Sequence, residues 1–367
     1  MQATSLLDAN VAHRLARSLL IVSLLIGAAA QAEERLMHGV TQAKDGVQIH
    51  YESGGRGSPA LVFIHGWNCD RSYWSAQLPF FAATHQVVAI DLAGHGDSGI
   101  NREEWSMANF GADVAVVAHA LQLEDIILVG HSMGGQVALE AAKLLKGRVK
   151  MIIGADTLSD VSLRYADAQL AAMLAAMEAD FPGTVDGMVR SSFFLPISDP
   201  ALIDQIARDM SAAPPAAGIG SLEGIARWYN EDVEQTLADI DVPIRLINSD
   251  YRPTNTRAGQ ALTASFEATL MSGVGHFVMQ EDPARFNAIM AELLNREQLL
   301  KSLTTAVQRH TPGKSDAEVV EVIVLKVSPR KLIPPIIVGG GRERLIVVRG
   351  LVGESLLASI DGIADRP

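Results

Sequence analysis

Ile126-Ile127-Leu128-Val129-Gly130-His131-Ser132-Met133-Gly134-Gly135 is the stretch that decides the fold. The apolar run 125–129 has strand length, and helical spacing follows the serine. G-x-S-x-G between a strand and a helix is typical of a sharp turn that exposes the serine oxygen at the carboxyl end of the strand. Gly130 and Gly134 provide the small residues that let strand and helix pack closely. The alternative is a chance glycine-rich turn, but the flanking elements favour Ser132 as a nucleophile.

Short apolar segments and helical segments alternate on both sides of this turn. Continuous apolar strands separated by helices are typical of a parallel sheet covered on both faces. Because such crossovers are right-handed, we predict an α/β fold with a mostly parallel, doubly wound sheet. The expected strands are 47–51, 60–64, 86–92, 125–129, 150–154, 244–247 and 266–271, and the expected helices are 72–84, 106–121, 134–146 and 283–295.

Residues 158–236 depart from this alternation. They are rich in Ala and Met, have helical spacing, and are interrupted by Pro214-Pro215. Since no strand-like run occurs in them, we expect a helical insertion that lies over the sheet, called the cap below. The α/β core is then expected at 33–157 and 237–296.

The first 32 residues have the layout of a secretory signal. A basic stretch ending at Arg17 precedes the apolar run Leu19–Ala30, and Ala30-Gln31-Ala32 presents small residues to a signal peptidase. We expect cleavage after Ala32 and an exported, periplasmic or secreted bacterial protein with no stable membrane anchor. A non-cleaved anchor is the alternative.

Composition narrows the class of partner. The net charge is -12 and the pI is about 5.3, which argues against nucleic acid, whose phosphates need clustered cations. The single cysteine, Cys69, cannot form an intrachain disulfide. An exported chain with so little cysteine is more typical of a bacterial periplasm than of a disulfide-rich setting.

A serine nucleophile needs a base, and the base needs an orienting carboxylate. His276 lies in the glycine-containing loop 272–277, after the last expected strand, and is the predicted base. Two carboxylates follow strands and could orient it. Asp250 is preferred from chain order, and Asp156 is the alternative acid.

The developing oxyanion needs backbone donors. We expect one from the amide of Met133, at the start of the helix after the nucleophile, where amides lack intrahelical acceptors. The other is expected from Trp67, in the loop after His65-Gly66, and Asn68 could add a side-chain donor.

Together these pieces resemble the α/β-hydrolase superfamily over about residues 38–296. The quoted motifs are His65-Gly66-Trp67, Asp91-Leu92-Ala93-Gly94-His95-Gly96-Asp97-Ser98, Gly130-His131-Ser132-Met133-Gly134-Gly135 and Gly275-His276-Phe277. The resemblance implies that the cap is a lid over a pocket. Residues that could line an apolar pocket, or instead pack the cap's own core, are Phe181, Met188, Phe193, Phe194 and Trp228. Haloalkane dehalogenases and epoxide hydrolases of this fold carry Asp at the nucleophile position. The serine at position 132 therefore argues against both of these enzyme classes.

The predicted function is therefore hydrolysis of a small-molecule carboxylic ester, or a similar acyl compound such as a lactone, through an acyl-enzyme. No metal and no organic cofactor is needed. Two alternatives stay open: perhydrolase, lyase or C–C hydrolase chemistry on the same residues, or a non-catalytic ligand receptor. The oligomeric state is not predicted.

Residues 297–367 lie beyond the expected core. They contain apolar runs rich in β-branched residues at 319–327 and 345–352, separated by Pro334-Pro335 and three glycines. The segment could be an added module, an interaction tail or an aberrant reading frame. We predict that it carries no catalytic residue.

Overall fold

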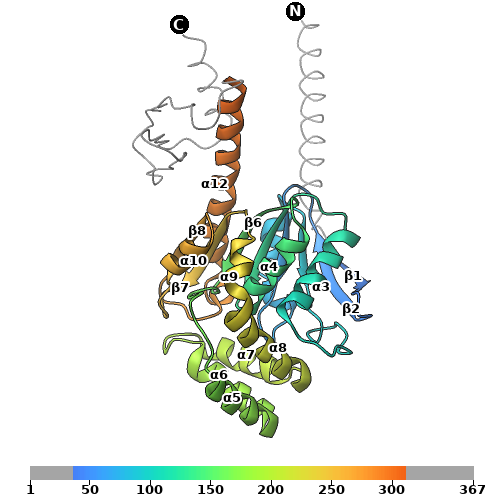
Figure 1. Cartoon of the computed structure of the whole chain (residues 1–367), viewed down its shortest axis with the longest axis vertical. Helices are drawn as coiled ribbons and strands as arrows, with labels where there is room; N and C mark the ends of the chain where they lie inside the picture. Colours follow the sequence, from blue (N-terminus) through green and yellow to red (C-terminus); the bar gives the residue numbers. More distant parts are fainter. Residues whose placement is uncertain (1–35, 311–367) are drawn as a thin grey trace, which may run out of the picture. The chain divides into compact units, whose positions relative to one another are not determined.

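The sheet organises the chain. The computed structural model describes the backbone of residues 36–310 and the side chains of residues 36–298. The chain divides into two units, Met1–Asn287 and Ala288–Pro367. The first contains an eight-stranded sheet in the order β1-β2-β4-β3-β5-β6-β7-β8, shown in Figure 1. The strands are β1 (Met37–Gln42), β2 (Gln48–Gly54), β3 (Ala60–Ile64), β4 (Val87–Ile90), β5 (Ile126–His131), β6 (Val149–Ala155), β7 (Ile244–Ser249) and β8 (Phe266–Met271).

The pairing confirms the predicted fold class. β1 and β2 run antiparallel, β2 pairs antiparallel with β4, and all pairs from β4 across to β8 are parallel. Every residue of β3, β4, β5 and β7 is buried. In β3 and β4 the buried residues are apolar throughout, as expected for central strands with helices on both faces of the sheet.

Helical elements lie between and after these strands. Ser106 caps the N-terminus of the helix that precedes β5, because its side chain accepts a hydrogen bond from the amide of Asn109 at 3.2 Å. The elements are η1 (Arg71–Trp74), α2 (Leu78–Ala82), α3 (Met107–Ala120), α4 (Met133–Leu144), η2 (Trp228–Asp232), α9 (Val233–Ala238), α10 (Thr256–Leu262), α11 (Val278–Glu281) and α12 (Pro283–His310).

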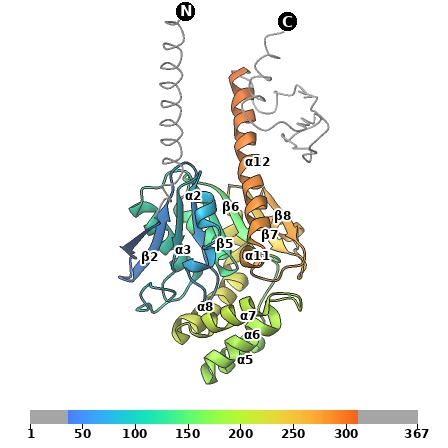
Figure 2. The ribbon, with the colours of Figure 1, turned by 180° about the vertical axis from the view of Figure 1, so that it is seen from behind.

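Helices also form the cap. Regular structure between β6 and β7 is helical throughout, and α5 to α8 gather at one end of the sheet in Figures 1 and 2. Asp180 and Asp199 begin two of these helices by accepting backbone amides of Gly183 and Ala201. The four helices are α5 (Asp167–Ala179), α6 (Phe181–Ser192), α7 (Pro200–Ser211) and α8 (Pro215–Arg227).

Some boundaries differ from expectation. The edge strand β1 and the short helix α10 were not predicted, and the helix expected over 72–84 is two short pieces, η1 and α2. The helix expected to end at Asn295 continues to His310, because neither Gly nor Pro occurs after Pro283 until Pro312. The predicted boundary at residue 296 therefore falls inside a helix.

The predicted signal peptide, residues 1–32, and the extension from 311 onward lie outside the described residues. Within 36–310, no helix combines the length and the apolar character required to cross a bilayer.

Candidate active site

Ser132 occupies the turn between β5 and α4. Its backbone has φ 51° and ψ -118°, a left-handed conformation that costs a non-glycine residue about 1–3 kcal/mol. Neighbouring groups hold the turn. The Ser132 amide donates to the carbonyl of Ala155 at 3.1 Å, and the hydroxyl of Thr157 donates to the Ser132 carbonyl at 2.6 Å. The strand–turn–helix context predicted from sequence is confirmed.

The flanking glycines are required by close backbone contacts. A Cβ on Gly130 would overlap the backbone of Gly134, and a Cβ on Gly134 would overlap the carbonyl oxygens of Ile64 and His65. Strand and helix can approach this closely only when both positions lack a side chain. Their packing in turn fixes Ser132 at the carboxyl edge of the sheet.

His276 lies in the loop that follows β8. Its amide donates to the carbonyl of Phe193 in the cap at 2.7 Å, and the Glu281 carboxylate accepts from the amides of Gly275 and Phe277. The ring nitrogen Nδ1 of His276 donates to Oδ2 of Asp156 at 2.6 Å. The two side chains are only 13% and 9% exposed, so water screens this pair weakly.

Asp156, not Asp250, is the carboxylate on His276, and the preference drawn from chain order was wrong. Asp156 follows β6 with φ 43°, and its second oxygen accepts from the amide of Ser249 at 2.8 Å. Asp250 is exposed. Because β6 and β7 are parallel neighbours, both carboxylates leave the same edge of the sheet, and the geometry of the two turns decides which one reaches the imidazole.

His131 also belongs to the site. Its Nε2 lies 3.0 Å from the carbonyl oxygen of His276, and the two rings lie 4.8 Å apart. Burial lowers the pKa of His131 well below its usual value, so the ring is neutral. A neutral imidazole can support His276 without repelling the positive charge that a base acquires.

The expected oxyanion donors belong to two segments that lie next to Ser132. Met133 is the first residue of α4, and a Cβ on Gly66 would lie 3.2 Å from the Ser132 Cβ, so the loop that carries Trp67 runs beside the nucleophile. The indole of Trp67 donates to the carbonyl of Gly218 in α8 at 2.7 Å. The roles of both amides stay predictions.

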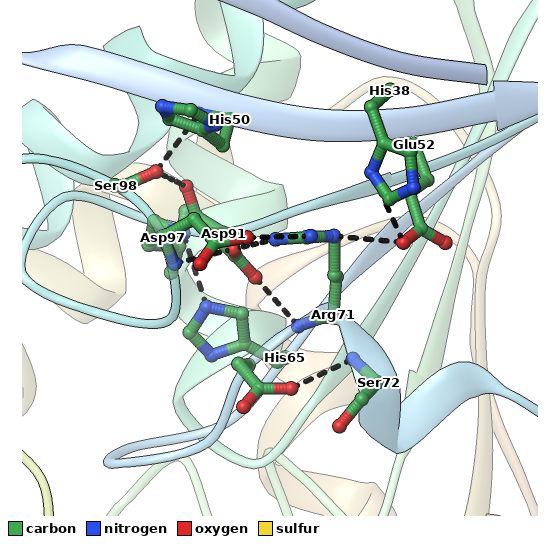
Figure 3. Close-up of polar contacts among 11 residues, drawn as sticks. His38, His50, Glu52, His65, Arg71, Ser72, Asp91, Asp97 and Ser98 are labelled. Carbon is green, nitrogen blue, oxygen red and sulfur yellow. Dashed lines mark hydrogen bonds and ion pairs between the residues drawn. The ribbon is translucent and has the colours of Figure 1, made fainter.

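An ion-pair cluster anchors this loop, and Figure 3 shows it. The Arg71 amide donates to the fully buried carboxylate of Asp91 at 2.8 Å, and the guanidinium pairs with Asp91, Asp97 and Glu52. His65 adds a second link, because its Nε2 accepts from the amide of Leu92 at 3.0 Å. Sequence reasoning missed Arg71, since nothing in the motifs around it indicates that it pairs with residues far along the chain.

Three of the predicted pocket residues lie near His276 or Trp67. The Phe193 ring lies 4.8 Å from that of His276, and Phe194 stacks on Phe277 at 5.4 Å. Phe181 lies against Gly218, near Trp67. Met188 is half-buried in α6 and stays a prediction.

Trp228 was wrongly placed in the pocket. Its indole nitrogen donates to the buried carboxylate of Glu140 in α4 at 2.8 Å, and the hydroxyl of Thr236 donates to the same oxygen at 2.7 Å. A buried tryptophan needs a hydrogen-bond partner for its N–H group, and the Glu140 carboxylate on α4 is that partner.

The sequence profile described as "Alpha/beta hydrolase family" matches residues 61–289. The chain belongs to this family. The eight-stranded sheet and the serine turn are thus those of an α/β hydrolase.

Several curated proteins are similar in sequence. A non-heme haloperoxidase of Rhodococcus erythropolis is 39% identical over 117 residues, which are 31% of this chain and 42% of that protein. The chain thus spans less than half the length of that relative. A bifunctional esterase/perhydrolase of Acinetobacter calcoaceticus is 27% identical over 58% of this chain and 81% of its own length.

Solved structures share the fold. An esterase from Thermogutta terrifontis superposes with a TM-score of 0.62 at 21% identity, covering 72% of this chain and 99% of that one. Est816, described as an N-acyl homoserine lactone degrading enzyme, superposes with a TM-score of 0.60 at 24% identity, covering 69% and 99%. At these identities the likeness concerns the fold alone.

Proposed function

We propose that this α/β hydrolase cleaves a carboxylic ester, or a related acyl compound such as a lactone, through an acyl-enzyme on Ser132. One observation carries the proposal: the 2.6 Å hydrogen bond from His276 to Asp156, in a loop whose backbone also contacts His131, the residue before Ser132. It leaves Nε2 of His276 as the nitrogen free to accept a proton.

The reaction follows from these positions. Nε2 of His276 takes the proton of the Ser132 hydroxyl as its oxygen attacks the carbonyl carbon, and the amides of Met133 and Trp67 stabilise the oxyanion. The imidazolium then protonates the leaving alcohol. In the second half, His276 activates a water molecule that releases the acid and restores the serine. Asp156 holds the imidazole in the required tautomer and balances its positive charge.

Nitrophenol release tests the proposal. Short and long nitrophenyl esters are offered to protein that starts at Glu33, beside the Ser132→Ala variant. We expect many turnovers per molecule from the first protein and none above background from the variant. A single burst, or equal release by both proteins, would point instead to a ligand receptor or to chemistry other than ester cleavage.

Perhydrolysis is a second candidate, because the names of two relatives are haloperoxidase and esterase/perhydrolase. Hydrogen peroxide would then attack the acyl-enzyme in place of water, releasing a peracid and free Ser132. Peracid formation from acetate and peroxide, measured against ester hydrolysis, compares the two. Peracid formation that survives in Ser132→Ala would exclude this route.

We also propose that the protein is exported and matured after Ala32, on the basis of the basic stretch, the apolar run and the Ala30-Gln31-Ala32 site. Expression of the full chain in a bacterium, followed by fractionation and N-terminal sequencing, checks this. A periplasmic product beginning at Glu33 is expected, whereas an intact N-terminus in the membrane fraction would indicate an uncleaved anchor.

A further inference from the structure

Asn68 is a buried amide without a partner beside the proposed oxyanion site. Its residue is 4% exposed, and neither Oδ1 nor Nδ2 makes a hydrogen bond within the part of the chain that the structure describes. Buried carboxamides are nearly always paired, because a buried polar group that loses water without gaining a partner destabilises the fold. A carboxamide kept in this state points to a ligand.

The surroundings show where the carboxamide points. Its Oδ1 would lie 2.8 Å from a Cβ on Gly218, and the Phe181 ring meets the same position. The adjacent Trp67 indole donates to the Gly218 carbonyl. Asn68 therefore lies where the loop after β3 meets the cap, among groups that do not hydrogen-bond its side chain.

Backbone conformation alone does not account for this residue. Asn68 has φ 55°, and asparagine tolerates the left-handed region better than most residues. Glycine tolerates it better still, and the chain uses glycine for positive φ nearby, at Gly94 and Gly96. A glycine at position 68 would satisfy the backbone without burying an unpaired amide.

We propose that Asn68 is a specificity-determining residue that selects esters carrying a hydroxyl group close to the reacting carbonyl. This inference rests on the proposed function. Consecutive Cα atoms lie about 3.8 Å apart, so the Asn68 side chain begins one residue from the Trp67 amide that is expected to hold the oxyanion. A hydroxyl suits the site because one oxygen can accept from Nδ2 and donate to Oδ1, which leaves both atoms paired. A trans secondary amide presents its N–H and C=O in opposite directions and can pair with only one of them.

Matched esters test the inference. The rates of hydrolysis of ethyl butyrate, ethyl 2-hydroxybutyrate, ethyl 3-hydroxybutyrate and 2-hydroxyethyl butyrate are followed by titration of the released acid. These substrates place the hydroxyl on the acyl or the alcohol side, and ethyl N-acetylglycinate presents a secondary amide for comparison. The quantity compared is the ratio of kcat/KM for each substituted ester to that for ethyl butyrate.

Asn68→Gly keeps the left-handed backbone accessible and removes the carboxamide. Gln122→Gly is the matched control, because Gln122 has φ 53°, is exposed, and precedes β5 at the end opposite Ser132. We expect at least one hydroxy ester to be preferred about tenfold by the unmodified protein and by Gln122→Gly, with the preference lost in Asn68→Gly. The melting temperature of Asn68→Gly should be no lower than that of the control, because the carboxamide makes no hydrogen bonds within the described fold and its unpaired burial is destabilising.

Two results would overturn the inference alone: ester turnover without any preference for a hydroxyl, or a preference that survives in Asn68→Gly. A higher rate with ethyl N-acetylglycinate than with every hydroxy ester would overturn the assignment of the hydroxyl. Failure of the unmodified protein to turn over any ester, nitrophenyl esters included, would overturn the proposed function and this inference with it.

Discussion

Replacing Asp156 by Asn should reduce kcat far more than the same change at Asp250. Asparagine fits the space of Asp156 and can keep the acceptor for the Ser249 amide, now 2.8 Å away. Its NH₂ group then faces Nδ1 of His276, where the carboxylate accepts at 2.6 Å. Two donors cannot pair, so His276 must move its proton to Nε2, the nitrogen that has to accept from Ser132.

The size of the effect follows from charge. Two unit charges about 4 Å apart attract by about 4 kcal/mol at an effective dielectric constant of about 20, which suits a pair as little exposed as this one. The imidazolium of the transition state loses that stabilisation, which corresponds to about a thousandfold in kcat. The unfavourable tautomer adds to this, and the comparable change in a serine protease costs about ten-thousandfold. We therefore expect kcat to fall by about 10³ to 10⁴.

The assay is nitrophenyl acetate hydrolysis by Asp156→Asn and Asp250→Asn under the same conditions. Asp250→Asn, at an exposed position, should stay within about twofold of the unmodified protein, as surface changes generally do. Thermal unfolding of both variants establishes that each is folded. A loss at Asp250 as large as the loss at Asp156, or more than a tenth of the activity left in Asp156→Asn, would refute the reasoning.

Three further predictions concern the fold around the site. Gly134→Ala should lower the free energy of unfolding by about 2 kcal/mol or more and abolish ester turnover, because the added methyl overlaps the carbonyl of Ile64. Urea unfolding measures the change in stability, and a variant as stable as the parent would contradict the close packing at Gly134. Burial lowers the pKa of His95 to about 3, so below pH 6.5 the unfolded chain binds a proton that the folded chain does not, and stability present above that pH is lost as the pH falls. The stability lost in this way is about 1.4 kcal/mol per pH unit for this group. His95→Asn should therefore make the free energy of urea unfolding less dependent on pH between pH 6.5 and 5. An unchanged dependence would be inconsistent with a neutral, buried His95. Trp228→Phe should cost about 1.5–3 kcal/mol of stability, because it removes a hydrogen-bond donor from the buried Glu140 carboxylate. The kcat per folded molecule should stay the same. A loss of kcat in fully folded protein would instead indicate that Trp228 lines the substrate pocket.

Much of this site could be predicted because its constraints are local. The turn is predicted by the spacing of Gly130, Ser132 and Gly134 alone, and the apolar runs around them predict a parallel sheet. The choice between Asp156 and Asp250 could not be made in the same way. It depends on a cross-strand hydrogen bond from Ser249 and on the backbone angles of one turn, and neither leaves a periodic signal.

The remaining misses have similar causes. Arg71 pairs with residues 19 to 26 positions away, and any of several basic residues could have been brought there by the fold. Trp228 was placed in the pocket because a large aromatic residue in the cap suits either environment, and only its contact with Glu140 separates the two. The length of α12 was missed by assuming a family boundary where the sequence continues to favour a helix.

The hydrogen bond between the Phe193 carbonyl and the His276 amide makes the cap part of the machinery that it covers. A motion that carries Phe193 away from the sheet must break this bond and separate two rings that lie 4.8 Å apart. The loop that carries the base is therefore restrained from two directions, by Asp156 at its side chain and by the cap at its backbone, so a change in the cap at Phe193 acts directly on the position of the imidazole.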